Sequence, residues 1–294
     1  MQSLEGIRRS ISTAEDLQSV VRMMKGVAAA NIREFERAVA SLGDYSRAIE
    51  LGIQTLLRSR PERLVATAPT SDGRLGAVVF GSDQGMCGRF NQQIATHAVT
   101  EIKKLAPRNE DRTILIVGAR ILALLEMDAL EIDERVATTT SLAGITSLVQ
   151  EILMHIESWR ERGAADRILL FYNEALGGAK YEPHTHQLFP VDFDWLRELR
   201  SREWPSNRLP IYTIDWDGLF SSLIREHLYI GIFRAAAESM ASENASRLAS
   251  MQVAERNIDD RLEELQVKYR HKRQQTITEE LLDIISGFEA LSTP

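Results

Sequence analysis

Apolar residues recur at intervals of seven through the first sixty residues of the chain, and no proline interrupts them. A sustained seven-residue repeat is typical of a long helix that supercoils against another helix. A second seam position is less regular, because Gln18, Lys25 and Ser46 interrupt it. We therefore predict an imperfect coiled-coil helix over residues 1–62. The seam consists of Ile7, Ala14, Val21, Ala28, Phe35, Leu42, Ile49 and Leu56.

The C-terminal stretch has the same character, since no proline lies between Pro210 and Pro294. A helix of about 70 residues would be on the order of 100 Å long. Two such helices cannot fold as separate small bundles, so we predict that residues 216–294 pair antiparallel with the N-terminal helix. The apolar positions here are Leu248, Met251, Ile258, Leu262, Leu265 and Tyr269, then Ile277, Leu281, Ile284, Phe288 and Leu291.

Between residues 70 and 215, strand-length apolar runs alternate with helical patterns. This order predicts a mostly parallel, Rossmann-like α/β domain whose sheet is covered by helices. Asn91 and Ser141 are expected N-caps, and Gly163 is an expected helix stop. We expect strands at 76–82, 113–119, 129–138 and 166–175, an edge strand at 184–193, helices at 91–106, 121–127 and 141–163, and a loop or short helix at 195–210.

Charge and cysteine content narrow the function. The net charge is −7, and no segment is basic enough to indicate nucleic-acid binding. The single cysteine, Cys87, excludes an internal disulfide. No apolar run reaches the roughly 18 residues that a membrane-spanning helix needs. Any membrane association is therefore expected to go through a partner.

The glycine-rich segment GSDQGMCGRFN, residues 81–91, follows an apolar run and leads into a helical pattern. Turns of this kind often hold phosphate through backbone N–H groups. Both nucleotide motifs fail, however, because the glycines at 81, 85 and 88 fit neither spacing and Gly88 is followed by Arg89 and Phe90. We interpret Gly85 and Gly88 as positions of positive φ in a tight turn, with direct nucleotide binding as the alternative.

Other reactive residues have ordinary structural explanations. Cys87 could be a catalytic thiol, but a lone cysteine is more often a small buried residue. His184 and His186 could share a strand face and bind metal, but no third ligand is evident. Asp83, between Gly81 and Gly85, is interpreted as an ordinary turn residue, with a role toward a substrate as the alternative. The basic run 268–273 is interpreted as a solvated helix face, with contact to an anionic partner as the alternative. No catalytic, cofactor or metal site is predicted.

Three separated motifs resemble one family, the gamma subunit of F-type ATP synthases. ITEELLDIISG, residues 277–287, is similar to its Ile-Thr-x-Glu-x-x-Asp/Glu-x-x-x-Gly signature. IRRSISTAEDLQSVVRMMKGVAAANI, residues 7–32, resembles its first helix. GSDQGMCGRFN resembles its Asp-x-Gly-Leu-Cys-Gly turn. The motifs occur in the family's order and extend over the whole chain.

The resemblance implies a central-stalk rotor subunit. The coiled coil would lie inside a ring of three alpha and three beta subunits, and the α/β domain would contact epsilon and the ring of c subunits. ATP would bind in alpha and beta, so this chain would be non-catalytic and without a cofactor. It would couple ion flow to ATP synthesis or hydrolysis at the cytoplasmic face of a bacterial inner membrane, as a peripheral protein attached through the c ring.

The resemblance also implies contact residues for the beta-subunit levers: Met24, Lys25, Gly85, Met86, Cys87, Gly88, Arg247, Gln274, Thr278 and Glu280. Four residues depart from the family pattern: Lys25 replaces an acid, Gly26 a methionine, Asn31 a lysine, and Phe288 the alanine that usually follows the signature glycine. These departures suggest a divergent alternate form. The competing hypotheses are a nucleotide-binding α/β enzyme with helical dimerisation arms and a coiled-coil adaptor.

Overall fold

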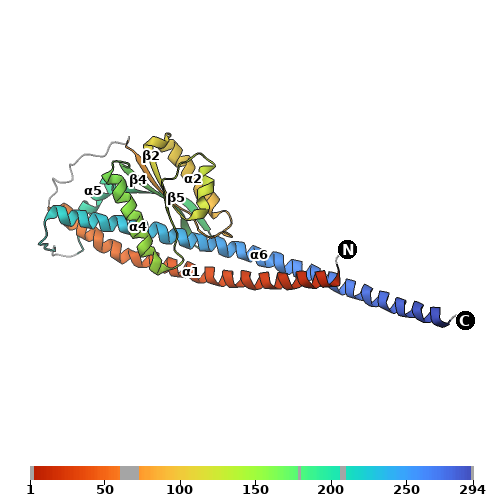
Figure 1. Ribbon diagram of the computed structural model, residues 1–294. Coiled ribbons are helices and arrows are strands. Elements are labelled where there is room, and N and C mark those ends of the chain that lie inside the picture. Colours follow the sequence, from red (N-terminus) through yellow and green to blue (C-terminus); the bar gives the residue numbers. More distant parts are fainter. Residues whose placement is uncertain (1–2, 60–72, 178–179, 206–209, 293–294) are drawn as a thin grey trace. The chain divides into compact units, whose positions relative to one another are not determined.

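The computed structural model describes residues 3–59, 73–177, 180–205 and 210–292 (Figure 1). Its two long helices are α1 (Leu4–Ser59) and α6 (Trp216–Ser292), of 56 and 77 residues. Both form where the proline-free, seven-residue pattern predicted them. Of the predicted ranges 1–62, 70–215 and 216–294, the end residues 1–2, 60–62, 70–72 and 293–294 lie outside the described residues.

The central sheet has five strands in the order β3-β2-β1-β4-β5. Neighbouring strands are parallel except for β5, which pairs antiparallel with β4 at the sheet edge. This arrangement confirms the predicted mostly parallel, Rossmann-like sheet and the presence of an edge strand. The bounds differ for two strands: the edge strand is 180–189 instead of 184–193, and β3 is only 134–136 of the predicted 129–138. The strands are β1 (Leu75–Phe80), β2 (Arg112–Val117), β3 (Glu134–Val136), β4 (Arg167–Gly177) and β5 (Lys180–Phe189).

The shorter helices are α2 (Phe90–Leu105), α3 (Leu122–Glu126), α4 (Leu142–Glu161) and α5 (Phe193–Ser201), with 3-10 turns η2 (Asn109–Asp111) and η3 (Ala119–Ile121). Ser141 caps α4 as predicted, since its side chain accepts a hydrogen bond from the Gly144 N–H. Gly163, with φ of 65°, follows the end of α4. The prediction for Asn91 was wrong, because Arg89 occupies the N-cap position of α2 and Asn91 lies in its first turn.

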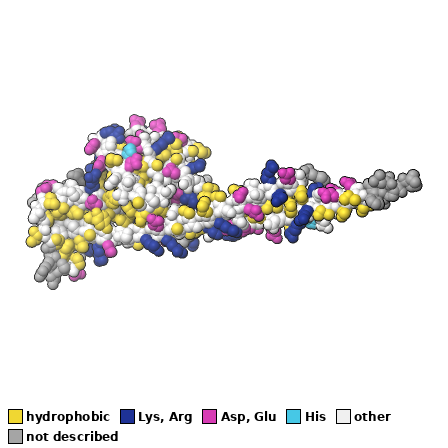
Figure 2. All heavy atoms as spheres, turned by 60° about the horizontal axis from the view of Figure 1, so that its bottom comes forward, with side chains coloured by type: hydrophobic (Ala, Val, Ile, Leu, Met, Phe, Trp, Pro, Cys, Tyr) yellow, Lys and Arg dark blue, Asp and Glu magenta, His cyan; other side chains and the backbone are white. Residues whose placement is uncertain are grey.

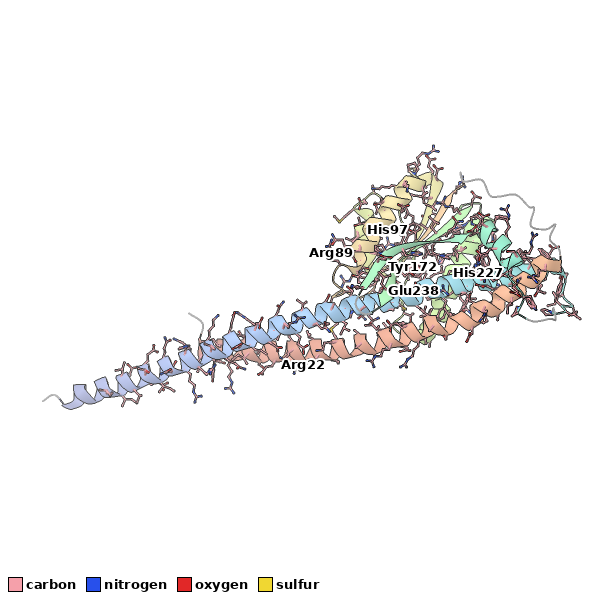
Figure 3. All side chains as sticks on the ribbon, turned by 180° about the vertical axis from the view of Figure 1, so that it is seen from behind. Arg22, Arg89, His97, Tyr172, His227 and Glu238 are labelled. Atoms are coloured by element: carbon pink, nitrogen blue, oxygen red, sulfur yellow. The ribbon has the colours of Figure 1, made fainter. Side chains whose placement is uncertain are left out.

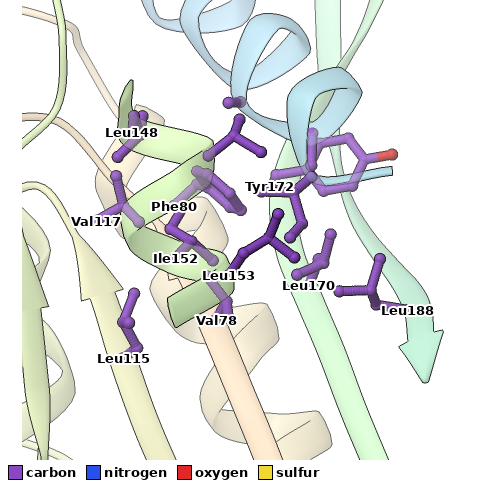
Figure 4. Close-up of a cluster of buried hydrophobic side chains, with 14 of the residues drawn as sticks. Val78, Phe80, Leu115, Val117, Leu148, Ile152, Leu153, Leu170, Tyr172 and Leu188 are labelled. Carbon is purple, nitrogen blue, oxygen red and sulfur yellow. The ribbon is translucent and has the colours of Figure 1, made fainter. Parts of the chain in front are cut away.

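Each face of the sheet buries a separate apolar cluster. One cluster joins the sheet to α4 and α6, and Figure 4 shows Val78, Phe80, Leu115, Ile152 and Tyr172 within it. The other joins the sheet to α2 and α3, where Ile94, Ala98 and Ile102 of α2 are fully buried. Because parallel strands are covered on both sides, their sequences are continuously apolar rather than alternating.

The chain divides into two compact units, and each unit contains part of both long helices. Unit 2, Ala28–Arg247, contains the sheet. In it α1 and α6 run antiparallel, since the Trp216 indole donates to the Leu56 carbonyl (3.0 Å), the Tyr45 hydroxyl donates to Glu226 (2.8 Å), and the Asn31 and Asn244 amides are 3.4 Å apart. The seam residues of this unit, from Ala28 to Leu56, are all buried.

Unit 1 consists of Met1–Val27 and Leu248–Pro294. Its two helical segments are also antiparallel, because Gln18 contacts Asp259 while Arg22 and Lys25 both contact Glu255. The helix pairing therefore confirms the predicted fold class in each unit. Ile7, Ala14, Met251, Leu262 and Leu265 are buried, whereas the seam residue Val21 is only half-buried.

Candidate functional site

The turn between β1 and α2, residues 81–89, has two residues of positive φ. They are Gly88 (56°) and Met86 (60°). The prediction for Gly88 is confirmed, but that for Gly85 was wrong, because the left-handed conformation falls on its neighbour Met86. Left-handed backbone costs an L-residue roughly 1–2 kcal/mol. Met86 adopts this conformation although its side chain is 60% exposed.

Side chains of the turn and of the first turn of α2 stabilise the shape of the 81–89 segment. The Asn91 side chain accepts a hydrogen bond from the Ser82 N–H (3.0 Å) and donates one to the Ser82 hydroxyl (2.8 Å). The Cys87 sulfur lies 3.5 Å from the Asn91 amide nitrogen and 3.6 Å from the Ser82 oxygen. The Asn91 side chain therefore stabilises the turn instead of capping α2. This explains why a residue type that usually caps helices occurs here as the second residue of α2.

Helix α6 packs against this turn at the place where an open α/β sheet usually binds its ligand. The strand order reverses between β1 and β4, and the crevice beyond such a reversal is the common nucleotide site. Here the Asn173 amide of β4 donates to the Phe90 carbonyl (3.1 Å), and Ser242 of α6 donates to the Asn173 carbonyl (2.9 Å). Ser246 donates to the Cys87 carbonyl at 2.5 Å. Hydrogen bonds between α6, β4 and the turn therefore lie at the end of the sheet where such a ligand usually binds.

Arg247 connects the same turn to α6. Its guanidinium lies 2.6 Å from Glu243 and 3.4 Å from the carbonyl oxygens of both Gln84 and Gly85. Both charged side chains are about nine-tenths buried. Burial raises the pKa of the Glu243 carboxyl, and the nearby Arg247 charge opposes that rise. The buried pair therefore stabilises the turn, because the Arg247 guanidinium donates to the carbonyl oxygens of Gln84 and Gly85.

Asp83 ties the ends of three strands together. Its carboxylate accepts hydrogen bonds from the Ala119 N–H (2.8 Å), the Thr138 N–H (2.7 Å) and the Thr138 hydroxyl (2.9 Å). Ala119 follows β2 and Thr138 follows β3. The interpretation of Asp83 as a turn residue was correct, although its partners lie far away in sequence.

The other reactive side chains are in structural environments. Cys87 is 3% exposed, and burial raises the pKa of its thiol, which disfavours the nucleophilic thiolate. His184 faces Glu174 (3.4 Å), and among the described residues no group of three potential ligands could hold a metal. In the basic run 268–273, Lys268, Arg270 and Arg273 are exposed, as a solvated helix face requires.

The remaining predicted contact residues lie on the helices of unit 1. Met24 is half-buried, and the Lys25 ammonium pairs with Glu255 at 2.5 Å. Gln274, Thr278 and Glu280 are exposed on α6. Apolar side chains reach the surface near them, at Ile277, Leu281, Leu282, Ile284 and Ile285. Figure 2 shows such apolar atoms among charged ones toward the C-terminal end of α6.

Sequence reasoning missed Asn173, Ser242, Glu243 and Ser246, which hold the turn from outside. One signal was available. Residues 235–246 contain many small side chains, and Ala235, Ala236, Ala237, Ala241 and Ala245 are all buried. A run of small residues on a helix permits close approach to a neighbouring backbone. Such a run can predict that α6 packs closely, but it does not identify the turn as the neighbour.

Comparison with known proteins identifies the family. A family model described as ATP synthase matches residues 3–291. The ATP synthase gamma chain of Brucella canis is 30% identical over 301 residues, covering 99% of this chain and 100% of that one. The chain belongs to the ATP synthase gamma-chain family. The gamma chain of Polynucleobacter asymbioticus, 25% identical over 294 residues, has the same coverage. Membership confirms the predicted rotor-subunit role over the enzyme and adaptor alternatives.

Solved structures of low sequence identity share the fold of this gamma chain. A chain of the Euglena gracilis mitochondrial ATP synthase, in a structure of OSCP, F1 and c-ring, matches with a TM-score of 0.62 at 19% identity, over 98% of this chain and 94% of that one. A chain from the central stalk and c-ring of the Tetrahymena thermophila mitochondrial enzyme matches with a TM-score of 0.58 at 19% identity, over 80% and 99%.

Proposed function

We propose that this gamma chain is a non-catalytic rotor, which couples ion flow through a c ring to ATP synthesis or hydrolysis in neighbouring alpha and beta subunits. The family match over residues 3–291 is the observation that carries the proposal. The end of the sheet at β1 and β4 supports the non-catalytic part, since Ser242 and Ser246 of α6 donate hydrogen bonds to the backbone there. ATP would then bind in alpha and beta, and the chain would carry no cofactor.

The surface of unit 1 supports a surrounding partner. Ile277, Leu281 and Ile284 of α6 are between 46% and 67% exposed. Apolar side chains repeated along one helix usually mark a protein interface. A ring of three alpha and three beta subunits would cover them, with Gln274, Thr278 and Glu280 adding polar contacts.

The beta levers are the proposed partners of Met24, Lys25 and the 85–88 turn. Met86 is the exposed side chain of that turn, while Cys87 and Arg247 would act by holding its shape. An asymmetric rotor favours a different conformation in each beta subunit through differential contacts. Turning it would therefore change the nucleotide affinity of each beta subunit in succession.

Epsilon and the c ring are the proposed partners of the α/β domain. Within the described part of the chain, no helix is both long and apolar enough to cross a membrane. The family match over residues 3–291 supports peripheral attachment through the c ring, and we infer that this is at the cytoplasmic face of a bacterial inner membrane.

A rotation assay tests the rotor proposal. Met127 is 84% exposed in the α/β domain, whereas Cys87 is buried, so a Met127→Cys variant offers one accessible thiol for attaching a bead. The labelled chain is assembled with alpha and beta subunits, and the ring of these subunits is fixed to a surface. The bead on the chain should then rotate in one direction when ATP is added. The unsubstituted chain is the labelling control. A stoichiometric complex that hydrolyses ATP with only random bead motion would contradict the proposal, as would tight ATP binding by the isolated chain.

A further inference from the structure

A cavity of about 330 Å³ lies in unit 2, between α6 and the β4–β5 edge of the sheet. Five elements line it, and its polar side chains include three histidines and three glutamates. Neither the rotor role nor the contacts with alpha and beta require such a cluster. The lining includes Ser46 and Glu50 of α1, Tyr172 and Glu174 of β4, His184 and His186 of β5, Trp195 of α5, and His227, Arg234 and Glu238 of α6.

Glu238 is the least satisfied group in this cavity. Its Oε2 atom is buried and has no hydrogen-bond partner among the described residues. Figure 3 shows Glu238 beside Tyr172, with His227 further along α6. A buried carboxylate oxygen without a partner is costly, whereas a protonated carboxyl is neutral and can donate its own hydrogen bond.

The neighbours of Glu238 favour its neutral form. Burial is the main cause that raises the pKa of Glu238 to about 7, and the negative charge of Glu174 adds to it, while the charge of Arg234 and a hydrogen bond with Tyr172 oppose it. Burial likewise lowers the pKa of His186 to about 4 and lowers that of His227. Burial in this cavity therefore favours the neutral, deprotonated form of His186 and His227 and the neutral, protonated form of Glu238.

The remaining facing groups are already engaged. Glu50 pairs with Arg202 at 3.0 Å, and His184 pairs with Glu174 at 3.4 Å. The Trp195 ring stacks on His227 with centroids 4.5 Å apart. These contacts join α1, α5 and β5 to the same cavity, so its charge state affects how α6 packs on the sheet edge.

We propose that Glu238 is the proton acceptor of a pH-sensitive contact that holds α6 against the β4–β5 edge. Its proton removes repulsion with Glu174, and the contact weakens when the proton leaves. Because its folded pKa is raised, its stabilising contribution falls as pH rises from about 4.5 to about 7. For His186 the sign is opposite, so stability falls as pH drops from 6.5 to about 4. These two contributions largely offset each other between about pH 4.5 and 6.5, and the loss from Glu238 alone remains as pH rises from 6.5 to about 7.

Thermal melts of the full chain between pH 5 and 8 test this proposal. Glu238→Gln keeps the shape without an ionisable group, so its Tm minus that of the wild type should rise by about 2–4 °C over this range. Glu151→Gln, at an exposed carboxylate on α4 of the same unit, should give a flat difference. A flat difference for Glu238→Gln would overturn the proposal.

Two further measurements keep the proposal falsifiable if Glu238→Gln does not fold. Isotope-edited NMR of glutamate carboxyl carbons in the wild-type chain should show one group titrating near pH 7. Glu174→Gln removes the neighbouring charge and should move that titration toward lower pH. The proposal fails if every glutamate titrates near 4.5 or if Glu174→Gln leaves the titration unchanged.

Discussion

The same two helices pack in different ways in the two units. In unit 2 their seam is closed by large side chains, since Phe35 and Ile53 are at most 1% exposed. In unit 1 the contacts include exposed charges such as Arg22 with Glu255, and apolar residues such as Val20 and Met23 face solvent. A seven-residue repeat therefore predicts that a helix pairs, but it does not predict how completely the pair is buried.

The largest expected effect comes from the seam of unit 2. Phe35→Ala should lower the free energy of unfolding by about 3–5 kcal/mol, because it leaves a cavity among fully buried neighbours. Val21→Ala, at the equivalent seam position of unit 1, should cost less than about 1 kcal/mol, because Val21 is only half-buried. Urea unfolding followed by circular dichroism measures both, and equal losses would show that the two seams do not differ.

Arg247→Ala should have the next largest effect. It leaves Glu243 and the Gln84 and Gly85 carbonyls without a buried donor, so a loss of about 1–3 kcal/mol is expected. The Tyr181 hydroxyl lies 3.1 Å from Ser246, the residue before Arg247. The Tyr181 ring should therefore become more accessible to solvent in the variant, and its NMR signals can follow this change. A loss no larger than that of exposed Arg270→Ala would mean that Arg247 does not support the turn.

Gly26→Ala should stabilise unit 1. Nothing lies within 4 Å of the added Cβ, and an exposed helix-interior glycine costs about 0.5–1 kcal/mol relative to alanine. Gly52→Ala is the matched change in unit 2, where the new Cβ would meet Leu223 at 3.1 Å. Helix content and Tm should rise for the first variant only. A gain from Gly52→Ala as well would weaken the packing difference between the units.

The smallest effect is expected from Glu255→Gln. Hydrogen bonds from Lys25 and Arg22 lower the pKa of Glu255, so its contribution is present above its ordinary value of 4.5 and is lost as pH falls through the lower folded pKa. Salt should screen it, because surface ion pairs are weak. The Tm difference from wild type should be small at pH 7 in low salt and vanish in 1 M salt. A difference that persists in high salt would contradict a screened surface contact.

Local pattern predicted the elements of this fold well. Both long helices, the mostly parallel sheet and the Ser141 cap follow from periodicity and capping rules, because those signals lie within a few residues of each other. Asn91 was misassigned because its partner, the Ser82 backbone, competes with the helix terminus. Asn173, Ser242 and Ser246 escaped prediction because their partners Phe90, Asn173 and Cys87 lie 83, 69 and 159 residues away in the chain. The lever contacts remain predictions, since their partners are other chains.

Hydrogen exchange, measured on the isolated chain and on the chain assembled with alpha and beta subunits, tests the contrast between the units most directly. The account predicts that amides in residues 3–27 and 248–285 exchange quickly in the isolated chain and slowly in the complex. Amides in residues 28–59 and 216–247 should be protected in both. Equal protection of the two sets in the isolated chain would contradict the claim that unit 1 needs a partner to complete its packing.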